Sequence, residues 1–214
     1  MTEGFRAYAL RAQCGSFDEL FASVRFEHVG KGRQGAVLVE PNAESDIPLV
    51  RTTTQYAAPP QQFRPIHTQL ARLIQQSAGL SLAFNSALVE HYTSSYATMG
   101  GHSDQALDLA EGSLIAVFSS YRDPSSPSRR LLVEPKFPDG VPFELPLLHD
   151  QAVVFSLEVN RRFRHKNLAE RARFEQPVAR LHVPHLEDLP ALQRRAAPLH
   201  HGRAPRAGER RTTT

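Results

Sequence analysis

The sequence predicts a mainly β fold of the sandwich or jelly-roll type, with helices flanking its N-terminal side. The first observation is a series of short segments after residue 79 that are rich in β-branched and aromatic residues and are separated by Pro, Gly and Asp turns. The second is helical spacing of apolar residues, which is confined to the N-terminal third. With 214 residues, 41% of them hydrophobic, the chain is long enough to enclose one core.

The N-terminal third predicts two helices and two strands. Residues 17–28 mix apolar and polar positions at helical spacing, and Ser16 precedes them as an N-cap, so we expect a helix there. Residues 66–76 repeat the helical spacing. Residues 36–40 and 49–56 are rich in Val, Thr, Leu and Tyr, which predicts a strand in each.

Five further strands follow, and they are expected to form the barrel. They cover residues 80–92, 114–121, 130–134, 143–147 and 152–157. We therefore expect three parts. Residues 1–78 pack on the barrel, residues 79–185 form it, and residues 186–214 are a basic tail with too few large apolar residues to offset its ordering entropy.

The distribution of charge and the cysteine content bear on the partners and the cellular compartment of the protein. From Arg161 to the end there are thirteen Lys or Arg against five Asp or Glu. A basic C-terminal segment of this kind is typical either of a nucleic-acid-binding region or of a solvated tail, and we expect a solvated tail. Because there is one cysteine, Cys14, and no apolar run near the roughly 18 residues that span a bilayer, we expect a cytoplasmic monomer without a membrane partner.

Two motifs carry candidate metal chemistry. His102 and Asp104 lie two residues apart, so their side chains share one side of an extended chain, and His165 follows the last predicted strand. Two histidines and one carboxylate in this order predict a facial triad for Fe(II), although the same ligand types suit other divalent metals. The alternatives are a turn histidine bonded to Asp104 and, for His165, a surface residue in a basic run.

The segments around these motifs resemble AlkB-like 2-oxoglutarate/Fe(II) oxygenases, in particular a branch with a His-Ser-Asp-Gln-Ala motif. The resemblance covers residues 47–166, and it implies a double-stranded β-helix that uses Fe(II), 2-oxoglutarate and O₂. It also implies that His102, Asp104 and His165 bind iron and that Tyr92, or alternatively Tyr96, contacts 2-oxoglutarate. Glu90 stands where the family often has asparagine.

The sequence departs from that family after His165. Relatives have a segment close to Asn-Arg-Trp-Leu-Gly-x-Thr-Phe-Arg, whose arginines bind 2-oxoglutarate, and nothing of that form follows here. Among Arg171, Arg173 and Arg180, Arg180 alone lies in a strand-like stretch, so it is the candidate. Codons that permit the residues after about Lys166 can encode the family segment when they are read one nucleotide later. We therefore hypothesise that the reading frame of the gene is displaced from about Lys166 onward. A gene that encodes no such segment in either shifted frame would refute this.

These observations predict a 2-oxoglutarate- and Fe(II)-dependent dioxygenase that hydroxylates or demethylates a substrate of unknown class: a small molecule, a protein or a nucleic acid. Two alternatives remain open. One is a catalytically impaired metal-binding jelly-roll protein, because the cosubstrate arginines are not found. The other is a nucleic-acid-binding module that uses the basic C-terminus.

Overall fold

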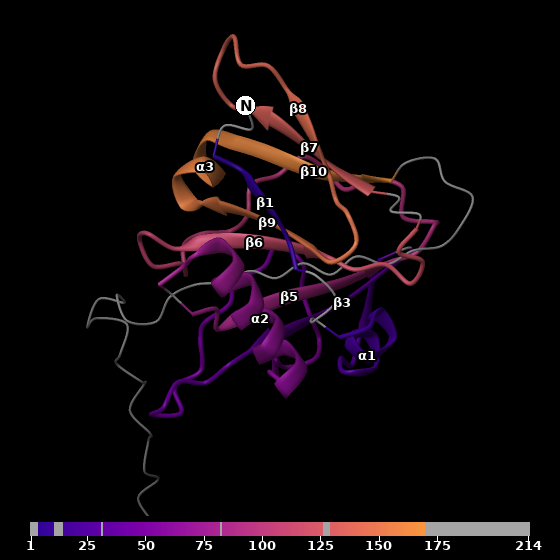
Figure 1. The fold of residues 1–214 in the computed structure, drawn as a ribbon, viewed down its shortest axis with the longest axis vertical. Coiled ribbons are helices and arrows are strands. Elements are labelled where there is room, and N and C mark those ends of the chain that lie inside the picture. Colours follow the sequence, from indigo (N-terminus) through magenta and orange to yellow (C-terminus); the bar gives the residue numbers. More distant parts are fainter. Residues whose placement is uncertain (1–3, 11–14, 31, 82, 126–128, 170–214) are drawn as a thin grey trace, which may run out of the picture.

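The computed structural model describes residues 4–10, 15–30, 32–81, 83–125 and 129–169, and the fold there is mainly β, as predicted (Figure 1). The elements in chain order are β1 (Arg6–Ala9), α1 (Phe17–Ala22), β2 (Glu27–Gly30), β3 (Arg33–Val39), β4 (Gln61–Gln62), α2 (Pro65–Ala78), β5 (Ser86–Tyr92), β6 (Leu114–Ser119), β7 (Arg129–Pro135), β8 (Phe143–Pro146), β9 (Gln151–Ser156), α3 (Leu157–Arg162) and β10 (Phe163–Ala169). Cys14, Arg180 and the predicted tail lie outside the described residues.

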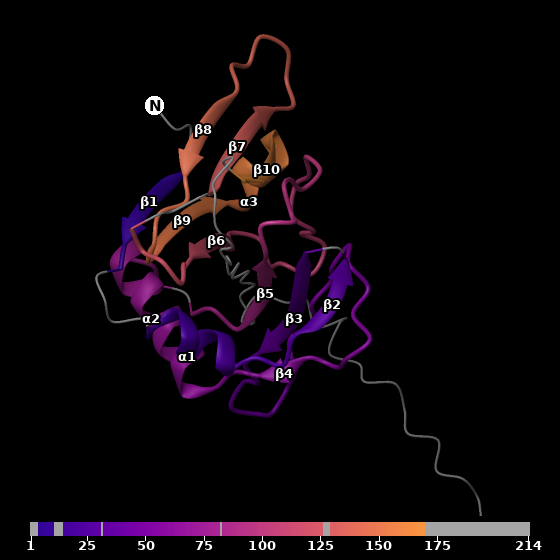
Figure 2. The same cartoon turned by 90° about the vertical axis from the view of Figure 1, so that its right-hand side faces the viewer.

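Three groups of strands build the molecule. One sheet has the order β1-β9-β6, and a second has the order β10-β7-β8. In the third group β3 pairs with β2, β4 and β5, and every pairing except β3 with β4 is antiparallel. Figure 2 shows β2, β3 and β5 side by side, below β6 and β9.

The β1-β9-β6 sheet is buried on both faces because its side chains alternate between two cores. Toward the β10-β7-β8 sheet it presents large aliphatic and aromatic residues, Ile115, Val117, Val153 and Phe155, which pack against Leu131 and Val133 of β7. Toward α2 and the β3–β5 pair its opposite face meets Leu70, Ile74, Ala87 and Val89. The result is a jelly-roll sandwich with α2 on the outer face of one sheet (Figure 1).

Several predicted elements are confirmed, and most of their ends agree with the structure to within one or two residues. The helix expected at 66–76 is α2, which begins at Pro65 and ends before Gly79, a residue in the left-handed conformation with φ of 64°. The strands expected at 36–40, 114–121, 130–134, 143–147 and 152–157 correspond to β3, β6, β7, β8 and β9. The strand predicted over 80–92 is shorter, because β5 begins at Ser86.

The prediction of one helix over residues 17–28 is wrong. α1 ends at Ala22 after about one and a half turns, although Ser16 is the expected N-cap and forms a capping box with Glu19. Residues 27–30 instead form β2, in which Glu27 pairs with Gly35 and His28 with Gln34 of β3. Pairing with a neighbouring strand outweighs helical spacing in so short a segment.

The prediction of a strand over residues 49–56 is also wrong. This segment forms no strand, despite its β-branched residues. Its polar groups bond to loops and side chains: the Arg51 amide donates to Asp108 Oδ2 at 2.6 Å, and Arg33 Nη2 donates to Thr54 Oγ1 at 3.0 Å. The segment has no place beside β3, because β2 and β4 pair with one side of that strand and β5 with the other.

No helix in the described part of the chain is both long and apolar enough to cross a lipid bilayer.

His67 of α2 is a buried neutral histidine, and it makes the stability of the fold depend on pH. Its Nε2 lies 2.7 Å from Ser23 Oγ, and its Nδ1 accepts from the Arg64 amide at 3.0 Å. Burial, with a smaller contribution from the positive charge of Arg64, lowers the pKa of His67 to about 4. Since the unfolded chain then binds the proton more tightly, this contribution to stability is present above pH 6.5 and is lost as the pH falls toward 4.

We expect the free energy of unfolding to drop on the order of 3 kcal/mol more in the wild type than in His67→Gln between pH 7 and pH 4. Urea denaturation of both proteins at several pH values measures the difference. An identical drop in the two proteins would assign the pH dependence to other groups.

Candidate metal centre

A short antiparallel pairing brings the two candidate histidines together. The His102 amide donates to the His165 carbonyl at 3.0 Å, and the His165 amide donates to the His102 carbonyl at 2.7 Å. The pairing continues at Thr98, opposite Leu168. Directly opposed residues in a ladder carry their side chains on the same face, and the two imidazole rings lie 4.7 Å apart between centroids.

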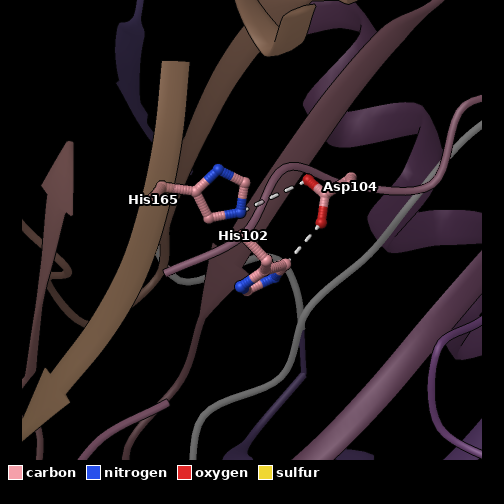
Figure 3. Close-up of side chains that lie close together, drawn as sticks. All are labelled: His102, Asp104 and His165. Atoms are coloured by element: carbon pink, nitrogen blue, oxygen red, sulfur yellow. Dashed lines mark ion pairs between the residues drawn. The ribbon is translucent and has the colours of Figure 1, made fainter. Parts of the chain in front are cut away.

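Asp104 completes the group. One of its carboxylate oxygens lies 3.7 Å from His102 Nε2, and the other lies 3.5 Å from His165 Nε2 (Figure 3). One ligand atom of each residue falls within 4.8 Å of the others. The structure therefore brings together all three residues that the sequence singled out as metal ligands.

Asp104 is held in place by Asn160, a residue that the sequence analysis missed. Asn160 Oδ1 accepts from the Asp104 amide, and Asn160 Nδ2 donates to the Asp104 carbonyl, both at 2.9 Å. Ser103 Oγ donates to the Phe163 carbonyl at 2.6 Å and fastens the same loop to β10. Asn160 belongs to α3, which the sequence marks by the N-cap Ser156, an acidic first turn and a basic last turn.

The donor atoms fit a divalent transition metal. His102 Nδ1 lies 2.9 Å from the Gly100 carbonyl, so that nitrogen carries the proton and Nε2 keeps its lone pair. The His165 side chain is 1% exposed, and its buried Nε2 has no hydrogen-bond partner. The alternative that His165 is a surface residue in a basic run is therefore wrong. Two imidazoles and one carboxylate match the ligand set of non-haem Fe(II) sites.

The centre opens into a cavity of about 280 Å³. Its walls come from β3, β5, the 50–54 segment and the 99–109 loop, and they include Arg33, Thr54, Glu90, Met99, Asp104 and Asp108. Residues 50–54 thus reach the site as an irregular segment, and the sequence offers no signal for this placement.

A buried ion pair forms the deep wall of the cavity. Glu90 is 1% exposed, and it accepts hydrogen bonds from Arg33 and from the Tyr92 hydroxyl. Burial lowers the pKa of the Arg33 guanidinium, but the charge and hydrogen bond of Glu90, together with Tyr92 and Tyr96, outweigh that effect, so the pKa is raised. Burial, and next the charge of Glu90, also raises the pKa of the nearby Tyr56.

Of the two predicted cosubstrate residues, the structure describes Tyr92 and does not describe Arg180. Tyr92 is fully buried on β5 behind Glu90, and its ring stacks on Tyr96 at 4.9 Å between centroids. Both tyrosines therefore lie near the wall of the cavity. Their contacts with Glu90 and with each other do not show whether either tyrosine binds 2-oxoglutarate. Arg180, like Arg171 and Arg173, lies outside the described residues.

Comparison with known proteins adds little to this geometry. No family model matches the sequence, and no match to a curated protein was found. Among solved structures, the chain is similar to a prolyl-4-hydroxylase from Pseudomonas putida, with 14% sequence identity and a TM-score of 0.47 over 86% of this chain and 95% of that chain. A similarity at this level carries no argument about function, which therefore depends on the site.

Proposed function

We propose that the chain is a 2-oxoglutarate- and Fe(II)-dependent dioxygenase that hydroxylates or demethylates a substrate. The observation that carries the proposal is the convergence of His102, Asp104 and His165, whose ligand atoms lie within 4.8 Å of one another beside a cavity. These two histidines and one carboxylate would hold Fe(II) and would leave positions open for a cosubstrate and O₂.

The described residues have defined tasks in this function. When bound, Fe(II) supplies the redox chemistry that activates oxygen. His102 and His165 would offer their Nε2 lone pairs, and Asp104 would offset part of the charge of the metal. The Gly100 carbonyl keeps His102 in the tautomer that ligation needs, and Asn160 keeps the carboxylate in reach of both rings.

The choice of iron and 2-oxoglutarate is supported by the resemblance of residues 47–166 to AlkB-like oxygenases. The ligand types alone also suit other divalent metals. The lining of the cavity contains both cationic residues, Arg33 and Arg51, and acidic residues, Glu90 and Asp108. This mixture accommodates a polar substrate and does not choose between small molecules, proteins and nucleic acids.

The proposal predicts that Fe(II) and 2-oxoglutarate bind together under anaerobic conditions, with the weak visible absorption of their complex. Admission of O₂ should then yield succinate in proportion to the 2-oxoglutarate consumed. If Fe(II) binds but 2-oxoglutarate produces neither absorption nor succinate, the chain is a metal-binding jelly-roll protein without this activity.

A further inference from the structure

An arginine is buried inside the jelly roll, close to the strand that carries His165. Arg129 begins β7 and is 3% exposed, on the same face of the strand as Leu131 and Val133. Its Nη2 donates to the carbonyls of Tyr96 at 2.8 Å and Thr93 at 3.3 Å, and its guanidinium lies 4.7 Å from the centre of the Tyr92 ring. Within the described part of the chain, no carboxylate forms an ion pair with it.

This arrangement leaves a positive charge in the interior with incomplete compensation. Burial lowers the pKa of Arg129, although the surrounding tyrosines counteract that effect in part. Carbonyl groups and an aromatic face offset only part of the cost of burying a cation. In addition, Arg129 Nε is buried and has no hydrogen-bond partner among the residues that the structure describes.

A second donor without an acceptor lies beside the arginine. Asn167 of β10 is fully buried, and its Oδ1 accepts from Arg129 Nη1 at 3.5 Å. Its Nδ2 has no hydrogen-bond partner in the described ranges of the chain. Arg129 Nε and Asn167 Nδ2 are both N–H donors, so the group that would satisfy them is an acceptor, and beside a cation it is best an anion.

Asn167 lies on the same face of β10 as His165 of the metal centre. His165 and Asn167 occupy alternate positions of β10, so both face the interior, and two residues of strand cover about 7 Å. That distance is comparable to the length of a five-carbon dicarboxylate. Met99 joins the two regions, because it lines the cavity, donates its amide to the Asn167 carbonyl at 3.2 Å and packs against Tyr92 and Tyr121.

We propose that Arg129 and Asn167 form the subsite for the distal carboxylate of the 2-oxo acid that binds at the metal centre. This inference rests on the proposed function. The planar guanidinium and the Asn167 amide donate to the carboxylate, while the 2-oxo end lies at the triad. Access from the cavity runs past Met99, whose unbranched side chain re-packs readily. The arginine of this subsite comes from β7 and therefore precedes His165 in the chain, whereas the arginines of the relatives follow the distal histidine.

The test compares two ligands that differ only at the far end. 2-Oxopentanoate has the same five-carbon chain as 2-oxoglutarate but carries a methyl group in place of the distal carboxylate. Titration calorimetry of the anaerobic Fe(II)-loaded protein should show that the wild type prefers 2-oxoglutarate by about tenfold to hundredfold. Arg129→Met should bind both ligands with equal affinity and should keep the wild-type metal content.

Two further variants make the comparison interpretable. Arg130→Met is the matched control, because Arg130 is the next residue of β7 and pairs with Glu144 at 2.9 Å, so it should keep the wild-type preference. Asn167→Leu removes the second donor while it fills the same space, and it should reduce the preference by a smaller factor. It also provides a test if Arg129→Met does not fold.

The outcomes separate the subsite from the function. If 2-oxoglutarate binds with the expected absorption but folded Arg129→Met and Asn167→Leu keep the full preference, the subsite is elsewhere and the proposed function stands. An equal affinity of the wild type for both ligands would also overturn the subsite alone. Metal binding without affinity for either 2-oxo acid would overturn the proposed function together with the subsite.

Discussion

Replacement of His102, Asp104 or His165 by alanine is expected to abolish stoichiometric Fe(II) binding in each case. The three side chains supply the whole predicted ligand set, with atoms within 4.8 Å of one another, so each variant leaves two ligands. The fold should survive, because the pairing of His102 with His165 uses backbone hydrogen bonds that alanine retains.

Metal content after anaerobic reconstitution measures the effect, and circular dichroism confirms that the variants are folded. His28→Ala is the matched control, because His28 is an exposed histidine on β2 and should not change metal content. If all three triad variants retained the metal content of the wild type, the ion would bind elsewhere and the assignment would fail.

Replacement of Asn160 by alanine is expected to weaken metal binding by about 10- to 100-fold, although Asn160 is not itself a ligand. Its side chain makes both hydrogen bonds that hold the Asp104 backbone, and it is 2% exposed. Without these hydrogen bonds the loop that carries Asp104 is no longer fixed to α3, and the carboxylate is no longer held near the two imidazoles.

Metal titration measures this effect, and thermal denaturation of the metal-free protein separates it from a loss of stability. Asn42→Ala is the control, because Asn42 also bonds to the backbone, accepting from the Asp46 amide at 2.8 Å, but does so in an exposed loop. A metal affinity that falls equally in both variants, or in neither, would contradict a positioning role for Asn160.

The sequence predictions are accurate for elements that local interactions determine and are wrong for segments that contacts with distant parts of the chain determine. α2 and strands such as β6 and β9 were predicted because long amphipathic or apolar segments contain their own signal. α1 was predicted too long and residues 49–56 were assigned wrongly, because these short segments are decided by what lies beside them. The pairing of β2 with β3 and the hydrogen bond between Arg51 and Asp108 are such neighbours.

The candidate site divides in the same way. The residue types at positions 102, 104 and 165, and the strand order between them, are properties of the sequence, and they were sufficient to name the three candidate ligands. Their convergence at one mouth of the barrel depends on the pairing of residues 97–102 with β10, a contact between segments far apart in the chain. Asn160 and Arg129 show no local sign of their surroundings, because burial and hydrogen-bond satisfaction exist only once the strands have packed.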